Sequence, residues 1–197
     1  MDIVGEKNMG HLWDDLAATH GNKTALVFEN TRGETSSYSY AGLNAKANQA
    51  ANLFLGLGVG KGDRVAVQLH NCPEFLFCWF GLARIGAVMV PINAHYLHDE
   101  CAHILKVCAP TALVIERQFL KAHTEVQAAH GISIRHTLVA RCGHDADAPP
   151  ALNFNRLLGE QSDAFAGRTS VSPEDPAEII FTSGTTSDPK GAVITHY

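Results

Sequence analysis

The densest group of small polar side chains lies near the end of the sequence, in the stretch FTSGTTSDPKGAVITHY. Residues 182–188 are all small or short and polar, and five of them carry hydroxyl groups. Gly184 permits backbone conformations that other residues avoid, and successive amide N–H groups in such a turn form an anion-binding concavity. Lys190 adds a cation, and Pro189 restricts the backbone just before it. These groups could hold a polyphosphate through charge-assisted hydrogen bonds, worth about 1.5–3 kcal/mol each.

Three other interpretations of this loop are a plain connection, a P-loop and a site with a nucleophilic serine. Its composition alone also fits a plain solvated connection between two strands. A P-loop needs G-x-x-x-x-G-K-S/T at the start of a helix, but here five residues separate Gly184 from Lys190 and a strand pattern follows. A nucleophilic role for Ser183 would need a G-x-S-x-G elbow and a partner base, and the sequence gives no cue for either. The P-loop and nucleophile interpretations are therefore disfavoured.

Alternating strand and helix patterns precede this loop and must position it. Apolar runs predict strands at 63–71, 87–93, 111–116, 136–140 and 177–183, and amphipathic patterns predict helices at 73–86, 98–108 and 118–131. Such alternation, with strands apolar on both faces, is typical of βαβ units around a buried parallel sheet. A further strand pattern at 190–196 means that the loop should join two strands. We therefore expect a three-layer α/β unit with a largely parallel sheet.

The segments before these alternating strands and helices predict a helix, a hairpin and a second helix. A short amphipathic helix is expected at 9–21 and a strand–turn–strand unit at 24–38. A long helix should follow at 39–58, with Ser39 as its N-terminal cap and Gly58 as its stop. One face of that helix is apolar, with Leu43, Ala47, Ala50, Ala51 and Phe54. Loops are expected at 141–152 and 162–176, with a short helix at 153–161 between them.

The composition indicates an ordinary globular protein. The sequence has 197 residues, 46% of them hydrophobic, and a formal net charge of −5, which disfavours nucleic acid as a partner because phosphate contacts need a concentrated basic patch. The five cysteines include no CxxC pair, which fits reduced thiols. Residues 1–15 lack the apolar run of a secretory signal, and the longest apolar stretch, 75–83, is too short to cross a bilayer. We therefore expect a cytoplasmic protein with no membrane partner.

One other group of side chains has the composition of a metal site. His95, His98, Cys101, His103 and Cys108 lie close together in the sequence, and zinc sites use such ligands. On a helix, however, His98 and Cys101 share a face while His103 points elsewhere. We therefore predict helix packing and no metal site. A core role is likewise predicted for the aromatic residues Phe75, Phe77, Trp79 and Phe80.

The stretch FTSGTTSDPKGAVITH resembles the phosphate-binding signature of the adenylate-forming enzymes, the superfamily of acyl-CoA synthetases, peptide-synthetase adenylation domains and luciferases. The usual form of that signature is Y/F-TSGTTGxPKGVxxTH. Ser187 departs from the usual Gly, and Ala192 from the commoner Val. A non-Gly residue in a left-handed conformation costs about 1–2 kcal/mol, so either Ser187 adopts another geometry or the loop closes less easily. The matching residues are Phe181, Thr182, Ser183, Gly184, Thr185, Thr186, Pro189, Lys190, Gly191, Thr195 and His196.

The likeness covers essentially the whole sequence and is weakest over 141–167. The stretches WDDLAATHGNKTAL and NCPEFLFCWFGLARIGAVMVPINA, together with Ser187, resemble the crotonobetaine/carnitine–CoA ligases of bacterial carnitine metabolism. This resemblance implies that 1–197 is the N-terminal part of an AMP-binding domain, ending just after the loop 181–191. The rest of the large domain and the C-terminal domain with its catalytic lysine would be missing. No catalytic residue is therefore expected within this chain, and the chain alone is expected to be inactive.

The resemblance also implies the chemistry. A carboxylate such as carnitine, crotonobetaine or a similar betaine would attack the α-phosphate of ATP, giving an acyl-adenylate and pyrophosphate. The thiol of coenzyme A would then displace AMP. ATP, Mg²⁺ and coenzyme A would serve the full-length enzyme, with none bound tightly to this chain. The cofactor-binding residues implied by the match are Thr182, Ser183, Gly184, Thr185, Thr186, Ser187, Lys190 and Gly191.

Two alternatives to a carnitine or crotonobetaine ligase stay open. One is another adenylate-forming ligase, such as a fatty-acid ligase, which downstream pocket residues would distinguish. The other is a truncated, non-catalytic protein that keeps only the anion-binding loop. In either case, apolar surface left uncovered by missing parts predicts self-association of the 197-residue chain.

Overall fold

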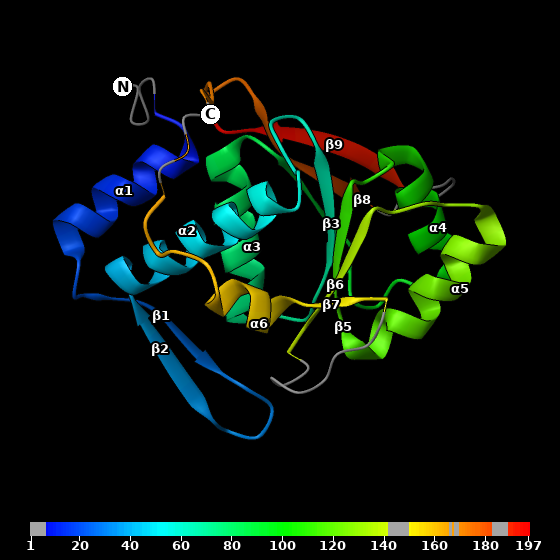
Figure 1. The fold of residues 1–197 in the computed structure, drawn as a ribbon, viewed down its shortest axis with the longest axis horizontal. Coiled ribbons are helices and arrows are strands. Elements are labelled where there is room, and N and C mark those ends of the chain that lie inside the picture. The colour runs from blue at the N-terminus through cyan, green and yellow to red at the C-terminus, as the bar shows by residue number, and fades with distance from the viewer. Residues whose placement is uncertain (1–6, 142–149, 166, 168–169, 183–188) are drawn as a thin grey trace.

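A seven-stranded sheet forms the centre of the molecule in the computed structural model, which describes residues 7–141, 150–165, 167, 170–182 and 189–197 (Figure 1). The strand order is β7-β6-β5-β3-β4-β8-β9. All neighbouring pairs are parallel except β8 and β9 at one edge, which run antiparallel. The predicted largely parallel sheet is therefore confirmed. Its strands are β3 (Arg64–Gln68), β4 (Val88–Pro91), β5 (Ala112–Glu116), β6 (His136–Ala140), β7 (Leu152–Asn153), β8 (Pro176–Thr182) and β9 (Lys190–Thr195).

Helices cover both faces of this sheet, which gives the predicted three layers (Figure 1). One face carries α2 (Tyr40–Gly56), α3 (Pro73–Ile85) and α6 (Phe154–Gly159), with α1 (Met9–His20) outside them. The other carries α4 (His98–Cys108) and α5 (Leu120–His130), which follows a short 3₁₀ turn at Arg117–Phe119. Each layer forms its own core against the sheet.

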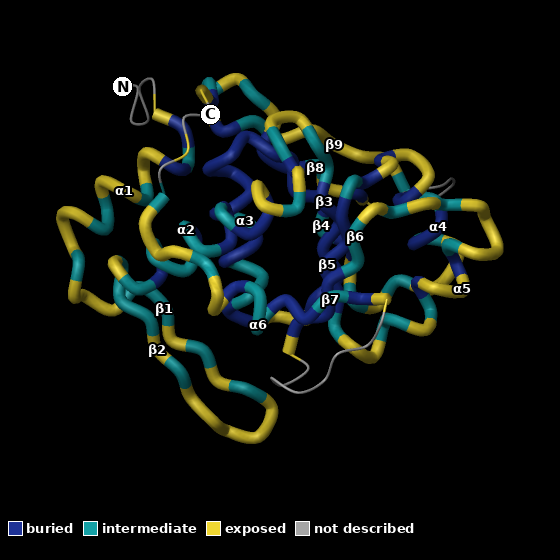
Figure 2. The backbone as a smooth tube through the Cα atoms, in the orientation of Figure 1, coloured by how far each residue is buried: buried dark blue, intermediate teal, exposed yellow. Residues whose placement is uncertain are grey.

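Successive side chains of the central strand β3 divide between these two cores. Val65 and Val67 pack in the cluster beneath α2 and α3, whereas Ala66 packs beneath α4 and α5. This alternation follows from the two-residue repeat of a strand. All three residues are fully buried, and Figure 2 shows the central strands as the most continuously buried part of the tube. The near-continuous apolar strands of the sequence are thus explained.

The long helix α2 begins and packs as the sequence predicts. The Ser39 side chain accepts a hydrogen bond from the Gly42 amide at 3.1 Å, so Ser39 is the N-terminal cap. The helix ends at Gly56, and Gly58 beyond it has a φ of +76°. The five apolar residues of the predicted face, Leu43, Ala47, Ala50, Ala51 and Phe54, are all buried.

A two-stranded antiparallel hairpin stands apart from the main sheet (Figure 1). It consists of β1 (Thr24–Glu29) and β2 (Thr35–Ser39), as the strand–turn–strand pattern predicts. Residues along it are mostly exposed or half-buried (Figure 2). The hairpin lies near the carboxyl ends of the central strands and contributes one wall of the hollow described below.

Two local features differ from the predictions. Leu152 and Asn153 form the short strand β7, which pairs parallel with β6, although the sequence predicted the end of a loop and the start of a helix there. A two-residue strand gives no periodicity to detect, since its existence depends on the neighbour it pairs with. The helix predicted from Gln118 starts with 3₁₀ geometry and becomes α-helical only at Leu120.

Candidate functional site

The predicted phosphate-binding residues divide between described and undescribed parts of the chain. Thr182 ends β8 and Lys190 begins β9, and the two residues are paired across the antiparallel ladder. Both are exposed. Residues 183–188 therefore connect two paired strands, as predicted. The predicted residues Ser183, Gly184, Thr185, Thr186 and Ser187 lie outside the described residues.

Gly191 allows the two strand ends to pack closely. A Cβ at this position would lie 2.9 Å from Cγ2 of Ile179 and 3.1 Å from Cζ of Phe181. Phe181 is Gly191's partner in the ladder and is buried. The absence of a side chain at Gly191 therefore lets Phe181 pack beside the backbone of β9. This is a specific reason for glycine in this part of the signature.

Thr182, at the end of β8, lies at the edge where ligands bind in open α/β sheets. Because β8 runs parallel to β4, its carboxyl end lies on the same edge as those of β3, β4, β5 and β6. Crevices beyond the carboxyl ends of parallel strands are the usual ligand sites of such sheets. The position of Thr182 at the end of β8 therefore agrees with a binding role.

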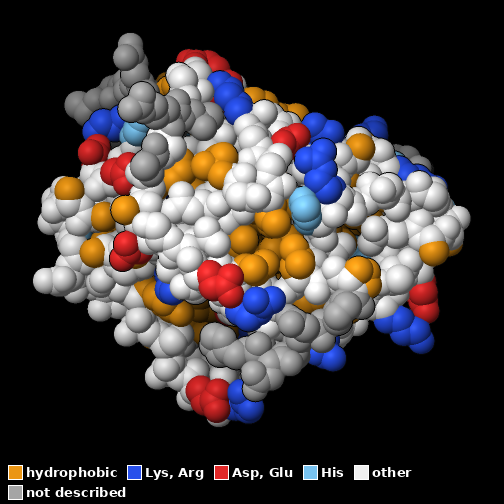
Figure 3. Space-filling model, viewed as in Figure 1, with side chains coloured by type: hydrophobic (Ala, Val, Ile, Leu, Met, Phe, Trp, Pro, Cys, Tyr) orange, Lys and Arg blue, Asp and Glu red, His pale blue; other side chains and the backbone are white. Residues whose placement is uncertain are grey.

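A hollow of about 1160 Å³ lies at this edge. It is called the sheet-edge hollow here. Ile180 and Phe181 of β8 form part of its wall, so it adjoins the strand that leads to Thr182. Its other lining residues come mainly from the ends of strands and the hairpin, namely residues 28–31, 69–71, 75, 91–96, 116–118 and 140–141. Figure 3 shows one face of the molecule, with hydrophobic side chains gathered near its middle and charged groups beside them.

A charged cluster lines the sheet-edge hollow. Glu116, at the end of β5, accepts hydrogen bonds from the His70 amide at 3.0 Å and from Gln118 Nε2 at 2.7 Å, and pairs with Arg141 at 3.1 Å. Burial alone would raise the pKa of Glu116, but the hydrogen bonds from His70 and Gln118 and the Arg141 charge outweigh it and lower that pKa. Glu116 therefore stays ionised and fixes the surrounding side chains.

Sequence reasoning missed this cluster. Its members lie at or just after the ends of three different strands, β3, β5 and β6, and are brought together only by the strand order. The available signal was that each stands directly after an apolar run, where the carboxyl edge of a parallel sheet gathers polar groups.

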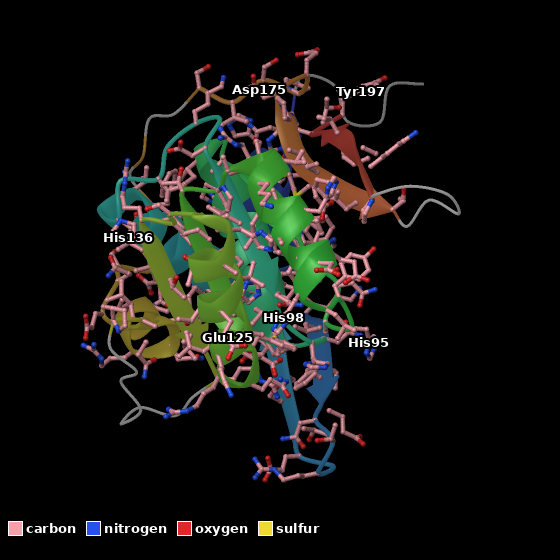
Figure 4. The ribbon with its side chains drawn as sticks, turned by 90° about the vertical axis from the view of Figure 1, so that its right-hand side faces the viewer. His95, His98, Glu125, His136, Asp175 and Tyr197 are labelled. Carbon is pink, nitrogen blue, oxygen red and sulfur yellow. The ribbon has the colours of Figure 1, made fainter. Side chains whose placement is uncertain are left out.

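His196, the last residue of the signature, lies at the opposite end of β9 from Lys190. It follows β9 and is buried, and its Nδ1 accepts a 3.4 Å hydrogen bond from the Met9 amide at the start of α1. Its own amide donates to the Asp175 carbonyl at 3.2 Å. Figure 4 shows Asp175 and Tyr197 at one end of the molecule, with His95 and His98 toward the other. His196 therefore anchors the far end of β9.

A second, smaller hollow of about 670 Å³ lies where α4 and α5 meet the sheet. At its wall the buried His123 donates from Nε2 to Oε1 of Gln68 at 2.6 Å, and Gln68 donates to the Asn93 carbonyl at 3.0 Å. Burial, followed by the charge of His98, lowers the pKa of His123 to about 4. His123 is thus held neutral in the interior.

The residues considered for a metal site do not converge. Cys101 and Cys108 are buried in the core beneath α4, which confirms their predicted packing role. His98 is instead exposed and lies 3.6 Å from a carboxylate oxygen of Glu125. Both residues are labelled in Figure 4. Within the described residues, no group of three or more His, Cys, Asp or Glu side chains could hold a metal ion.

The aromatic residues of α3 pack as predicted. Phe77 and Phe80 belong to the core, and Phe75 and Trp79 pack against it. Among the described residues, no helix combines the length and the apolar character needed to cross a membrane.

Comparison with known proteins gives consistent matches. The family model described as AMP-binding enzyme matches residues 13–197. Crotonobetaine/carnitine–CoA ligase of Salmonella agona is 48% identical over 198 residues, which cover 100% of this chain and 38% of that protein. The chain therefore spans about two fifths of the length of such relatives.

Solved structures agree with the predicted fold. The anthranilate CoA ligase AuaEII, in complex with anthranoyl-AMP, is 26% identical with a TM-score of 0.85, over 97% of this chain and 35% of that one. ATP-bound MatB from Rhodopseudomonas palustris is 28% identical with a TM-score of 0.76, over 97% of this chain and 35% of that one.

Proposed function

Because this chain belongs to the AMP-binding enzyme family, we propose that residues 1–197 form the N-terminal part of an ATP-dependent acid–thiol ligase. The observation that carries this proposal is the position of Thr182 and Lys190. They form a ladder pair at the carboxyl edge of a parallel sheet, where open α/β sheets bind ligands. The hydroxyl and ammonium groups that these paired residues carry suit the phosphates of ATP.

The reaction has two steps. The substrate carboxylate attacks the α-phosphorus of ATP, forming an acyl-adenylate and releasing pyrophosphate. The thiol of coenzyme A then attacks the acyl carbon, forming the thioester and releasing AMP. Mg²⁺ would accompany ATP, and no described residue of this chain is proposed as its ligand.

The proposed role of residues in this chain is to hold the leaving pyrophosphate. The Lys190 ammonium offsets negative charge on the β- and γ-phosphates, and the Thr182 hydroxyl donates a hydrogen bond. Ser183, Thr185, Thr186 and Ser187 would add hydroxyl and amide donors, with Gly184 letting the backbone approach. Donors aimed at charge that grows in the transition state contribute most to rate. No residue of this chain is assigned to proton transfer.

We further propose a betaine carboxylate, carnitine or crotonobetaine, as the acyl substrate. This choice is supported by the name of the Salmonella agona relative, which is 48% identical over this segment. A trimethylammonium group is recognised by aromatic faces, at about 0.5–2 kcal/mol per contact. The sheet-edge hollow offers aromatic rings from Phe28, Phe75 and Tyr96.

The domain assignment follows the same proposal. Residues 1–197 would be one part of the AMP-binding domain, ending just beyond the loop 181–191, and would be inactive without the remainder. The complete enzyme would form its product in the cytoplasm, where ATP and coenzyme A are available. Thioester formation by the isolated 197-residue chain, followed by chromatography of the CoA products, would contradict this assignment.

The role of Lys190 is tested by Lys190→Met in the full-length gene product. Loss of one charge-assisted contact of about 1.5–3 kcal/mol should lower kcat/KM for MgATP roughly 10- to 160-fold. Lys121→Met is the matched control, because the Lys121 side chain is exposed on α5 and lies outside the site. Steady-state kinetics with varied MgATP measure both. Equal kinetics for the two variants would contradict the proposed role of Lys190.

A further inference from the structure

A histidine of α4 contacts both strand ends that flank residues 183–188. Its side chain, His103, has Nε2 at 2.9 Å from the carbonyl oxygen of Pro189. The same ring meets the Phe181 ring edge-on, with centroids 6.3 Å apart and planes at 85°. Phe181 lies at the end of β8, and Pro189 immediately precedes β9. One side chain from a different layer therefore joins the two strand ends.

The hydrogen bond shows that Nε2 of the imidazole carries a proton. A carbonyl oxygen can only accept, so Nε2 of His103 carries the proton and donates it. Both the neutral Nε2–H tautomer and the imidazolium have this proton. The contact therefore does not require a particular charge on His103, and it lies in a half-buried position between α4 and the sheet.

Holding the Pro189 carbonyl also orients Lys190. The carbonyl of Pro189 and the amide of Lys190 belong to one planar peptide unit, and the proline ring restricts φ on its other side. The next residue, Gly191, lies against the Phe181 ring that His103 also touches. The first residues of β9 are thus fixed from two directions by a group centred on His103.

We propose that His103 is a positioning residue for Lys190. By donating to the Pro189 carbonyl, it sets the direction in which the Lys190 backbone enters β9 and hence where its ammonium group can reach. This inference rests on the proposed function, since it assigns the polyphosphate of ATP as the ligand that Lys190 meets. The competing explanation is that His103 only fills space between α4 and Phe181.

Two substitutions separate the hydrogen bond from the packing. His103→Phe keeps a ring against Phe181 but removes the donor, whereas His103→Gln keeps an N–H donor at a similar reach. The matched controls are His130→Phe and His130→Gln, because His130 is exposed at the end of α5 and contacts Lys106 rather than β8 or β9. All variants are made in the full-length gene product.

The measurements are MgATP affinity by calorimetry, KM for MgATP and for coenzyme A, and the melting temperature. Loss of one hydrogen bond in His103→Phe should weaken MgATP binding about five- to tenfold, with KM for coenzyme A unchanged. His103→Gln should stay within about twofold of the wild type, as should both His130 variants. If His103→Phe is not folded at the assay temperature, His103→Leu serves as the donor-free variant.

The outcomes distinguish this inference from the function on which it rests. A wild type that binds MgATP, with donor-free variants that bind it equally well, would overturn the positioning role. Equal losses in His103→Gln and His103→Phe would also overturn it and leave only packing. A wild type that binds no MgATP and forms no adenylate would overturn the proposed function, and the inference would fall with it.

Discussion

At the scale of single residues, His123 is the clearest case of a titratable group held in one state. It is 1% exposed, and its Nε2 donates to Gln68. Within the described residues its Nδ1 is buried without a hydrogen-bond partner. Protonation would place an unpaired N–H in the interior, which is costly, and this explains a pKa of about 4.

This residue should make stability depend on pH. Its folded-state pKa lies below the ordinary value of 6.5, so the unfolded state binds a proton first as pH falls. The stability it contributes is complete above pH 6.5 and is lost between there and about pH 4, a total of about 3 kcal/mol. His123→Gln, which cannot titrate, should show a correspondingly smaller loss. Urea unfolding at several pH values between 7 and 4 measures the free energy of unfolding of both proteins.

The control for this experiment is His130→Gln, at the exposed end of α5. It should follow the pH dependence of the wild type. Parallel stability curves for the wild type and His123→Gln would show that His123 is not the residue responsible.

How much of the site could be predicted depends on how local its interactions are. Ser39 as a cap and Thr182 and Lys190 as loop flanks were predictable, because their signals lie within a few residues of sequence. The Glu116 cluster and the contact between His103 and Pro189 were not. Both join residues from separate layers or strands, and only the strand order brings them together.

At the scale of elements, α2 and α3 pack closely against each other at Gly81. A Cβ on Gly81 of α3 would lie 2.7 Å from Cβ of Ala50, 2.9 Å from the amide of Ala51 and 3.0 Å from the carbonyl of Ala47. Two of these contacts are to backbone atoms, which cannot move without shifting the helix. Small residues on α2 and a glycine on α3 therefore set the distance between these helices.

Gly81→Ala should destabilise the protein although alanine is the better helix former. Overpacking costs about 1–3 kcal/mol, and the gain in helix propensity offsets about 1 kcal/mol of it. Gly56→Ala makes the same chemical change at the end of α2, where a Cβ would meet nothing within 4 Å, and should stabilise by about 0.5 kcal/mol. Denaturant unfolding of both variants measures the difference. Equal stabilities would contradict the close packing of α2 and α3.

The predicted elements were mostly right because each has its own periodicity and end signals. Strand order could not be predicted from the sequence, since it depends on which βα units turn toward which neighbour. The short strand β7 was missed for a related reason, because Leu152 and Asn153 become a strand only by pairing with β6.

At the scale of the whole molecule, apolar side chains remain exposed around the edge strand β9. Ile180, Val193 and Ile194 are 38%, 59% and 43% exposed. An edge strand with exposed apolar side chains can pair with another chain. Relatives such as the Salmonella agona ligase are longer than this chain, which covers 38% of that protein. We therefore expect the 197-residue chain to self-associate through β9.

Val193→Lys should reduce that association, because a lysine on an edge strand opposes pairing with another strand. Val107→Lys on α4 is the matched control, since Val107 is similarly exposed but lies on a helix. Analytical ultracentrifugation over a range of concentrations should show a larger monomer fraction for Val193→Lys alone. A wild-type chain that stays monomeric throughout would contradict the expectation.

The central claim concerns the reaction of the whole protein, and carboxylate-dependent exchange of radioactive pyrophosphate into ATP tests it most directly. The full-length gene product is assayed with carnitine, crotonobetaine, a fatty acid or no acid. Our account predicts exchange with carnitine or crotonobetaine and none without an acid. Exchange with the fatty acid alone would keep the adenylation step but contradict the proposed substrate. No exchange with any acid would contradict the proposed function itself.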